Sequence, residues 1–138
     1  MGALVIHGPA SANYDEDLGA LILNDWYWET IWRLIVQTRD RLQNLPSGDL
    51  PGSGPRFSDN ILVNGTNKNP VGDGGRHHVT KVEPGKTYRL RLINVSTDNA
   101  LRVSLDGHTL QVITADSVPV QPFTVASLML NVGTILAD

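Results

Sequence analysis

A chain of 138 residues is long enough for one folded domain and too short for two. Its net charge of −3 and its pI near 5.7 exclude the broad positive surface expected of proteins that bind nucleic acid or anionic membranes. The absence of cysteine excludes disulfides and metal sites built on thiolates, so stability must come from packing.

The beginning of the chain resembles a short strand and a linker rather than a targeting segment. Residues 3–6 are apolar and are closed by Gly8-Pro9, and residues 10–17 are small, polar and acidic. The first residues lack the basic region and the long apolar region of a secretory signal, and no run approaches the ~18 apolar residues of a membrane helix. We therefore expect no membrane partner, and the sequence assigns no cellular location.

A helix is predicted after a first strand at residues 19–26. Apolar residues recur there at the three- and four-residue spacing of a helix: Trp28, Trp32, Ile35 and Leu42. We call these four residues the helix stripe. They predict an amphipathic helix over residues 29–45 that packs against the sandwich described below. Asp25 or Thr30 is the expected N-terminal cap, and Pro46 ends the helix.

The central stretch runs from Tyr88 to Asp116 and contains three runs in which apolar residues alternate with others. Such alternation is typical of strands buried on one face, and the Asp106-Gly107 step favours a tight primed hairpin turn. The sequence therefore predicts an antiparallel β-meander. We expect three side chains to share one core: Leu92, Val103 and Val112. We expect the arginines between the apolar positions to face solvent: Arg89, Arg91 and Arg102.

Shorter elements complete the predicted architecture. A strand is expected at residues 60–64, a type II turn at Glu83-Pro84-Gly85-Lys86 and a last strand at residues 123–132, with loops at 47–58 and 67–77. Short strands with frequent turn signals and one helix are typical of an all-β Greek-key sandwich.

A family resemblance is carried by two motifs of the central stretch. Tyr-x-Leu-Arg-Leu-Ile-Asn-Val begins at Tyr88, and Asp-Gly-His-Thr-Leu-x-Val-Ile-x-Ala-Asp ends at Asp116. Together with Asn24-Asp25-Trp26-Tyr27 and Ile61-Leu62-Val63-Asn64-Gly65-Thr66, they resemble the middle cupredoxin domain of laccase-like multicopper oxidases, particularly the fungal ones. The resemblance covers roughly residues 3–133.

The resemblance implies a division of the chain and an open edge. Residues 1–10 resemble the last strand of the preceding cupredoxin domain, residues 11–18 a linker, and residues 19–138 a partial second cupredoxin-like domain. The family pattern continues after Gly133 into a further strand, whereas this sequence changes to Ile135-Leu136-Ala137-Asp138. We therefore expect a truncated sandwich, incomplete at its C-terminus, with an edge free for self-association or for the remaining domains of a multicopper oxidase.

The family reaction is the copper-dependent one-electron oxidation of phenols with reduction of dioxygen to water. The resemblance implies His-x-His or His-Cys-His segments as copper ligands, and the sequence contains neither. The adjacent His77 and His78 would point to opposite faces of a strand, and His7 and His108 are expected to be turn or packing histidines. We expect no catalytic, cofactor-binding or metal-binding residue in this chain.

Two functions remain open from the sequence. One is a structural or cleft-forming segment of a laccase-like oxidase, and the other is a free-standing, copper-free cupredoxin-like binding or interaction module. Candidate residues of a ligand groove are Trp26, Tyr27, Trp28 and Trp32, although core packing is an alternative role for them. Asn64 and Asn94 begin sequons and are candidate glycosylation sites, since the family is often secreted.

Overall fold

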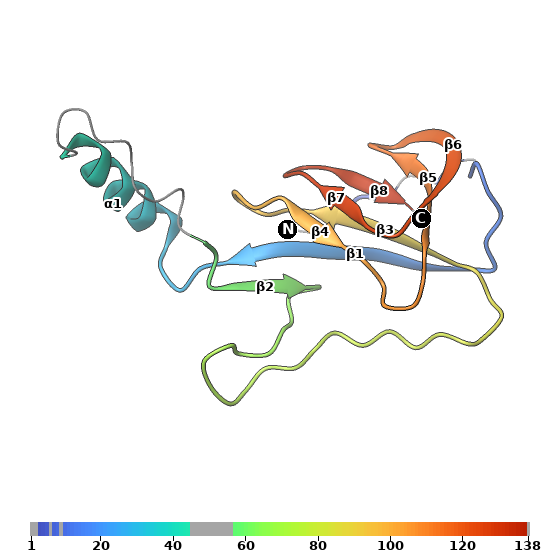
Figure 1. Cartoon of the computed structure of the whole chain (residues 1–138), viewed down its shortest axis with the longest axis horizontal. Coiled ribbons are helices and arrows are strands. Elements are labelled where there is room, and N and C mark those ends of the chain that lie inside the picture. Colours follow the sequence, from blue (N-terminus) through green and yellow to red (C-terminus); the bar gives the residue numbers. More distant parts are fainter. Residues whose placement is uncertain (1–2, 6, 9, 45–56, 138) are drawn as a thin grey trace.

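The computed structural model describes residues 3–5, 7–8, 10–44 and 57–137 (Figure 1). Its strands form a six-stranded sheet in the order β2-β1-β3-β8-β5-β6 and a two-stranded sheet of β4 and β7. The six-stranded sheet comprises β1 (Glu16–Trp26), β2 (Asn60–Val63), β3 (Tyr88–Asn94), β5 (Leu110–Ala115), β6 (Val118–Val125) and β8 (Ile135–Ala137). The other sheet comprises β4 (Leu101–Val103) and β7 (Leu128–Leu130). The all-β sandwich with one helix predicted from the sequence is confirmed.

The core lies between the two sheets. Its buried side chains are Leu23, Leu92, Leu110, Val112, Leu128 and Leu130. Leu92 and Val112 are 1% exposed, and Val103 is partly buried against the same cluster. The predicted common core of Leu92, Val103 and Val112 is therefore confirmed.

The predicted β-meander is wrong in its pairing. β3, β4 and β5 exist, but β4 pairs with β7 in the second sheet, while β3 and β5 lie on either side of β8. The turn before β5 has a positive φ at Gly107 but not at Asp106, as in a type II turn, and it carries the chain from one sheet to the other. Alternation shows which face of a strand is buried, but not which strand lies beside it.

The sheet also departs from the expected antiparallel pairing. β1 and β3 run parallel, with Leu21 opposite Leu92 and Leu23 opposite Asn94. The stretch 123–132, predicted as one strand, is divided between β6 and β7, which belong to different sheets. Residues 135–137, for which no strand was predicted, form β8 between β3 and β5. Residues 3–5 belong to no strand, so the assignment of residues 1–10 to a preceding domain stays a prediction.

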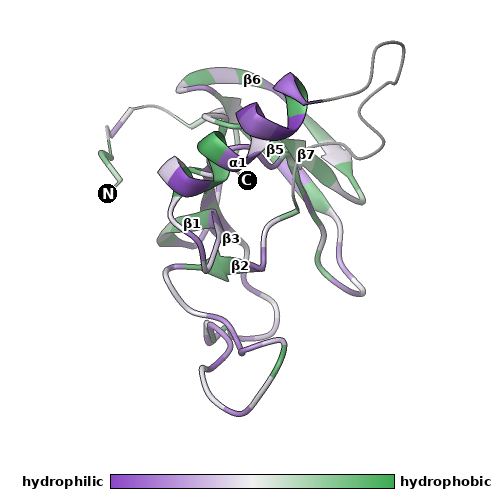
Figure 2. Ribbon diagram, turned by 90° about the vertical axis from the view of Figure 1, so that its left-hand side faces the viewer, coloured by the Kyte–Doolittle hydropathy of each residue, from purple (hydrophilic) through white to green (hydrophobic). Residues whose placement is uncertain are grey.

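The predicted helix exists as α1 (Ile31–Gln43), but its predicted packing is wrong. The side chains of Trp28, Trp32, Ile35 and Leu42 are 61%, 73%, 54% and 52% exposed. In Figure 1, α1 extends from the end of β1, away from both sheets, and Figure 2 shows hydrophobic residues on this helix in front of the sheets. Its buried side chain among the described residues is Leu34. The amphipathic spacing predicted the helix correctly, but it does not show which surface the apolar side of the helix contacts.

The predicted cap is also only partly correct. Thr30 occupies the N-cap position, yet its side chain makes no capping hydrogen bond, and Asp25 lies within β1. At the other end, residues 45–56 lie outside the described residues, so the predicted stop at Pro46 and most of the predicted loop at 47–58 are untested.

Candidate functional site

The aromatic residues predicted to form a groove lie around the end of β1. Trp26, Trp28 and Trp32 are exposed, so core packing, the alternative role, does not apply to these indoles. Tyr27 is half-buried, and its hydroxyl oxygen accepts a 3.0 Å hydrogen bond from the side-chain amide of Asn99. None of the four lines either of the two pockets described below, so a ligand at this aromatic surface stays a prediction.

Asp25 organises the turn that leaves β3. Its carboxylate accepts hydrogen bonds from the backbone N–H groups of Thr97 (2.8 Å) and Asp98 (3.1 Å) and from the side-chain amide of Asn99 (2.9 Å). Burial raises the pKa of Asp25, but these hydrogen bonds outweigh it, and the pKa lies below its ordinary value of 3.8. Asp25 is therefore a structural carboxylate that fixes residues 97–99 against β1.

The two sequon asparagines have opposite environments. Asn94 is 0% exposed, and its amide nitrogen donates to the carbonyl oxygens of Asn99 (3.0 Å) and Leu130 (2.9 Å). A glycan at Asn94 would have to displace this enclosed nitrogen from at least one of its two hydrogen bonds, and glycosylation there stays a prediction. Asn64 is exposed, and glycosylation there stays a prediction.

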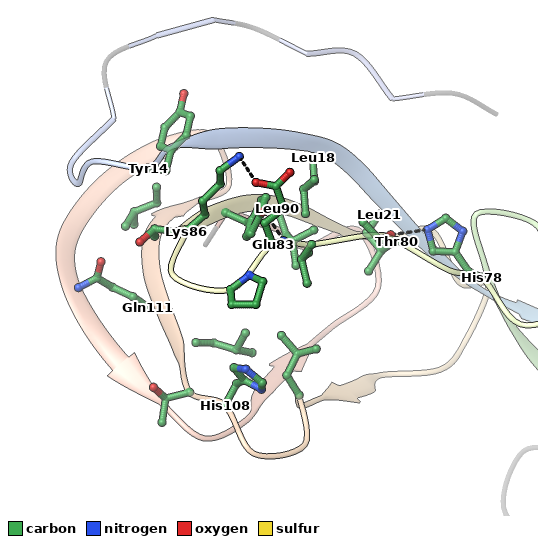
Figure 3. Close-up of a pocket in the computed structure, with 18 of the residues that line it drawn as sticks. Tyr14, Leu18, Leu21, His78, Thr80, Glu83, Lys86, Leu90, His108 and Gln111 are labelled. Carbon is green, nitrogen blue, oxygen red and sulfur yellow. Dashed lines mark hydrogen bonds and ion pairs between the residues drawn. The ribbon is translucent and has the colours of Figure 1, made fainter.

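The larger pocket, which we call the sheet pocket, has a volume of about 890 Å³. One wall is the apolar face of the six-stranded sheet, including Leu18 and Leu21 of β1, Leu90 of β3 and Leu110 of β5. The opposite wall is the segment of residues 77–87 that leads into β3, together with the turn at residues 105–109 (Figure 3). Because Leu110 also belongs to the core, the sheet pocket is continuous with the sandwich interior.

Polar groups occupy the edges of the sheet pocket. Lys86 Nζ lies 2.6 Å from Glu83 Oε2, and this hydrogen bond raises the pKa of Lys86 (Figure 3). His78 Nε2 lies 3.1 Å from the Thr80 hydroxyl, and His108 Nδ1 donates a 2.9 Å hydrogen bond to the carbonyl oxygen of Asp106. An apolar floor with a few polar groups at its edge is the usual construction of a site for small apolar molecules.

A second pocket has a volume of about 400 Å³ and is lined by two arginines of β3, Arg89 and Arg91. Both residues are 9% exposed, so the prediction that they face solvent is wrong. Arg91 forms a bidentate pair with Asp17 of β1. Since β1 begins at Glu16, the strand includes residues 16–18 of the predicted linker. This pair could not be predicted from the sequence, because it depends on the unexpected parallel alignment of β1 with β3. We call this cavity the arginine pocket.

The donor atoms of the chain do not fit a copper centre. Copper sites of oxidases are built from converging imidazoles with a thiolate at one copper, and the sequence has four histidines and no cysteine. Within the described residues, no group of three or more histidine, aspartate or glutamate side chains converges on one point. The same residues include no helix long and apolar enough to span a membrane.

Comparison with known proteins places the chain in a family. Residues 18–137 match the family described as "Multicopper oxidase". A laccase of Neurospora crassa is 44% identical over 133 residues, which are 96% of this chain and 20% of that laccase. A laccase of Cryphonectria parasitica is 42% identical over 134 residues, again 96% of this chain and 21% of the relative. The chain thus spans about a fifth of the length of these curated relatives.

Solved structures agree with this placement and confirm the cupredoxin-like fold. The crystal structure of a laccase from Botrytis aclada superposes with a TM-score of 0.75 at 36% identity, over 96% of this chain and 24% of the laccase. Fet3p, a multicopper oxidase that functions in iron import, superposes with a TM-score of 0.67 at 23% identity and supports the fold alone. The chain belongs to the multicopper oxidase family, as a segment similar to part of the fungal laccases.

Proposed function

We propose that this chain serves a laccase-like multicopper oxidase as a copper-free segment, spacing the flanking domains and forming one wall of the cleft that admits phenols. One observation carries the proposal: residues 18–137 match the family, yet the chain has no cysteine and no His-x-His pair. Residues elsewhere in the oxidase would hold copper and perform the electron transfer. The contribution of this chain is then positioning rather than redox chemistry.

The partner of the exposed helix stripe would be the remainder of the oxidase polypeptide. Large exposed apolar surfaces mark contact sites, and the stripe exposes the indole of Trp32 on a helix that covers neither sheet and the indole of Trp28 just before that helix. The relatives are about five times longer than the segment they share with this chain, so they contain polypeptide available to cover such a surface. A second copy of the chain is the competing occupant.

A chimeric laccase tests this function. The segment of the Neurospora crassa laccase that aligns with this chain is replaced by the present sequence, and copper content, the absorption of the copper centres and phenol oxidation are measured. We expect the chimera to hold copper and oxidise phenols, and the isolated chain to do neither. One tightly bound copper per isolated chain with a charge-transfer band, or a copper-loaded chimera without turnover, would refute the proposal.

A matched pair of variants tests the partner. Trp28→Ser with Trp32→Ser should reduce the yield of folded, copper-loaded chimera, because these indoles would contact the rest of the oxidase. The same change should hardly alter unfolding of the isolated chain, where both side chains are exposed. Sedimentation of the isolated chain distinguishes a second copy: a dimer that the double substitution dissociates would assign the stripe to self-association instead.

A further inference from the structure

The arginine pocket lies on the face of the six-stranded sheet opposite the core. Arg89, Arg91 and Ile93 alternate with Leu90 and Leu92 along β3, and Leu92 is the core residue. Side chains at every second position share one face of a strand, so both guanidinium groups stand on the outer face. The pocket is closed in part by the first described residues, including Leu4 and Val5, and in part by Thr114 of β5.

The two arginines of this pocket differ in how their charges are balanced. Arg91 is paired with Asp17 through both terminal guanidinium nitrogens, with Nη2 2.5 Å from Oδ2. Burial raises the pKa of Asp17, but the hydrogen bonds from Arg91 and from the backbone N–H of Gly19, with the charges of Arg91 and Arg89, lower it below its ordinary value. The Arg91 charge is thereby neutralised within the chain.

Arg89 has no such partner among the described residues. Its Nη1 donates a 3.3 Å hydrogen bond to the Tyr14 hydroxyl, and its guanidinium carbon lies 5.3 Å from the centroid of the Tyr14 ring. Its Nε is buried and finds no hydrogen-bond acceptor within the part of the chain that the structure describes. A buried charge is costly unless an opposite charge and full hydrogen bonding offset the loss of water, so this guanidinium group, on a residue 9% exposed and with an unused donor, suits an anion as its partner.

The walls of the pocket restrict what that anion can be. The surface beside the guanidinium groups is largely apolar and is formed by Leu4, Val5, Ile93, Pro119 and Ile135. One uncompensated positive charge in such a cavity suits a monoanion with an apolar body better than a strongly hydrated, doubly charged phosphate. The planar guanidinium group matches a carboxylate, which accepts two parallel hydrogen bonds from it. A volume of about 400 Å³ accommodates a small aromatic or aliphatic acid.

We propose that the arginine pocket binds an apolar monocarboxylate, with Arg89 pairing with the carboxylate and the aliphatic walls holding the body of the ligand. Arg91 stays paired with Asp17, and this pair holds β3 against β1 at the base of the arginine pocket. This site is separate from the helix stripe and does not depend on the proposed role in an oxidase.

Benzoate is the ligand used to test binding, and benzamide, which has the same ring but no charge, is the control. Calorimetric titration of the full chain at neutral pH should show saturable binding of benzoate and at least tenfold weaker binding of benzamide. Arg89→Gln should weaken benzoate binding by at least tenfold. Arg102→Gln, which changes an exposed arginine of β4, should leave it unchanged. Absence of saturable benzoate binding by the folded parent chain, or equal binding by Arg89→Gln, would overturn the proposal.

The location of binding is tested without relying on a variant that must fold. In the ¹⁵N-labelled parent chain, benzoate should shift the amide signals of Ile93, Thr114 and Ser117 at the arginine pocket. It should leave Leu21 and Gln111, at the sheet pocket, unchanged. Shifts centred on the sheet pocket would overturn the assignment, whether or not Arg89→Gln folds.

Discussion

The side-chain amide of Asn94 donates a 2.9 Å hydrogen bond to the carbonyl oxygen of Leu130. Asn94 ends β3 in the six-stranded sheet and Leu130 ends β7 in the two-stranded sheet, so this bond joins the two layers of the sandwich. The Asn94 side-chain oxygen also accepts from the backbone N–H of Ser96 at 3.0 Å. Every polar atom of this fully buried side chain is therefore used.

We expect Asn94→Ala to lower the free energy of unfolding by at least about 2 kcal/mol, because it leaves two carbonyl oxygens and one N–H without partners in the interior. Urea unfolding measures the change. Asn131→Ala removes an exposed asparagine next to β7 and should change the unfolding free energy by less than about 0.5 kcal/mol. Equal urea midpoints for the two variants would show that Asn94 does not connect the sheets.

Acid should weaken the fold through Asp25 and Asp17. Burial raises the pKa of each carboxyl, but the hydrogen bonds that each carboxylate accepts lower it by more. Both pKa values therefore lie below the ordinary 3.8. The folded chain then takes up protons less readily than the unfolded chain. The resulting stabilisation is fully present at pH values above the pKa of the unfolded chain. It is lost as the pH falls from that pKa to the lower pKa of the folded chain, and it is absent at still lower pH.

A variant separates the contribution of Asp25. Asp25→Asn should be less stable than the parent at neutral pH, since the amide cannot accept from three donors as the carboxylate does. It should also lose less stability on acidification, because one of the two titrating carboxyls is gone. Urea unfolding from about pH 7 to about pH 2 measures both effects. Parallel pH profiles for parent and variant would contradict the assignment.

The helix should contribute little to the stability of the isolated chain. Trp32 is 73% exposed, so Trp32→Ala should change the free energy of unfolding by less than about 1 kcal/mol. Leu92→Ala is the buried comparison and should cost about 2–5 kcal/mol. With Trp26 and Trp28 replaced by Phe, Trp32 should emit at a wavelength typical of water. An emission maximum typical of an apolar interior would contradict the exposed position of the helix stripe.

β4 offers a test of strand phase with neighbouring residues. Val103 packs against the core cluster, whereas Arg102 is exposed. Val103→Asp places a charge in the core and should abolish folding, while Arg102→Ser should change stability by less than about 1 kcal/mol. Circular dichroism with thermal unfolding distinguishes the two. A folded Val103→Asp chain with the parent melting temperature would show that the strand presents its other face.

The sequence predicted strands well because alternation is a local property. β1, β2 and β3 lie close to their predicted positions, and Gly85, with a φ of +84°, occupies the predicted turn before β3. The prediction of which strands pair was wrong, because pairing joins residues that are distant in the chain. Nothing around residue 91 indicates a parallel neighbour in β1.

The candidate sites were missed for the same reason. Arg91 and Asp17 are 74 residues apart, and each taken alone resembles a solvated charge. Only the parallel register of β1 and β3 turns them into a buried pair. The sheet pocket is likewise formed by residues of three strands, β1, β3 and β5, and by the segment of residues 77–87 that lies over them. From the sequence alone its leucines are indistinguishable from ordinary core residues.

The position of β8 bears on how the chain folds as it is made. β8 pairs with β3 through Leu92 and Leu136 and with β5 through Ala115 and Leu136, and it separates those two strands in the sheet. On a ribosome, β1, β2 and β3 can assemble early and β5 with β6 can form a hairpin, but the two halves have no shared edge until residues 135–137 emerge. The six-stranded sheet is therefore completed only once β8 has been made, and a translation pause before that point would hold two half-sheets with open edges.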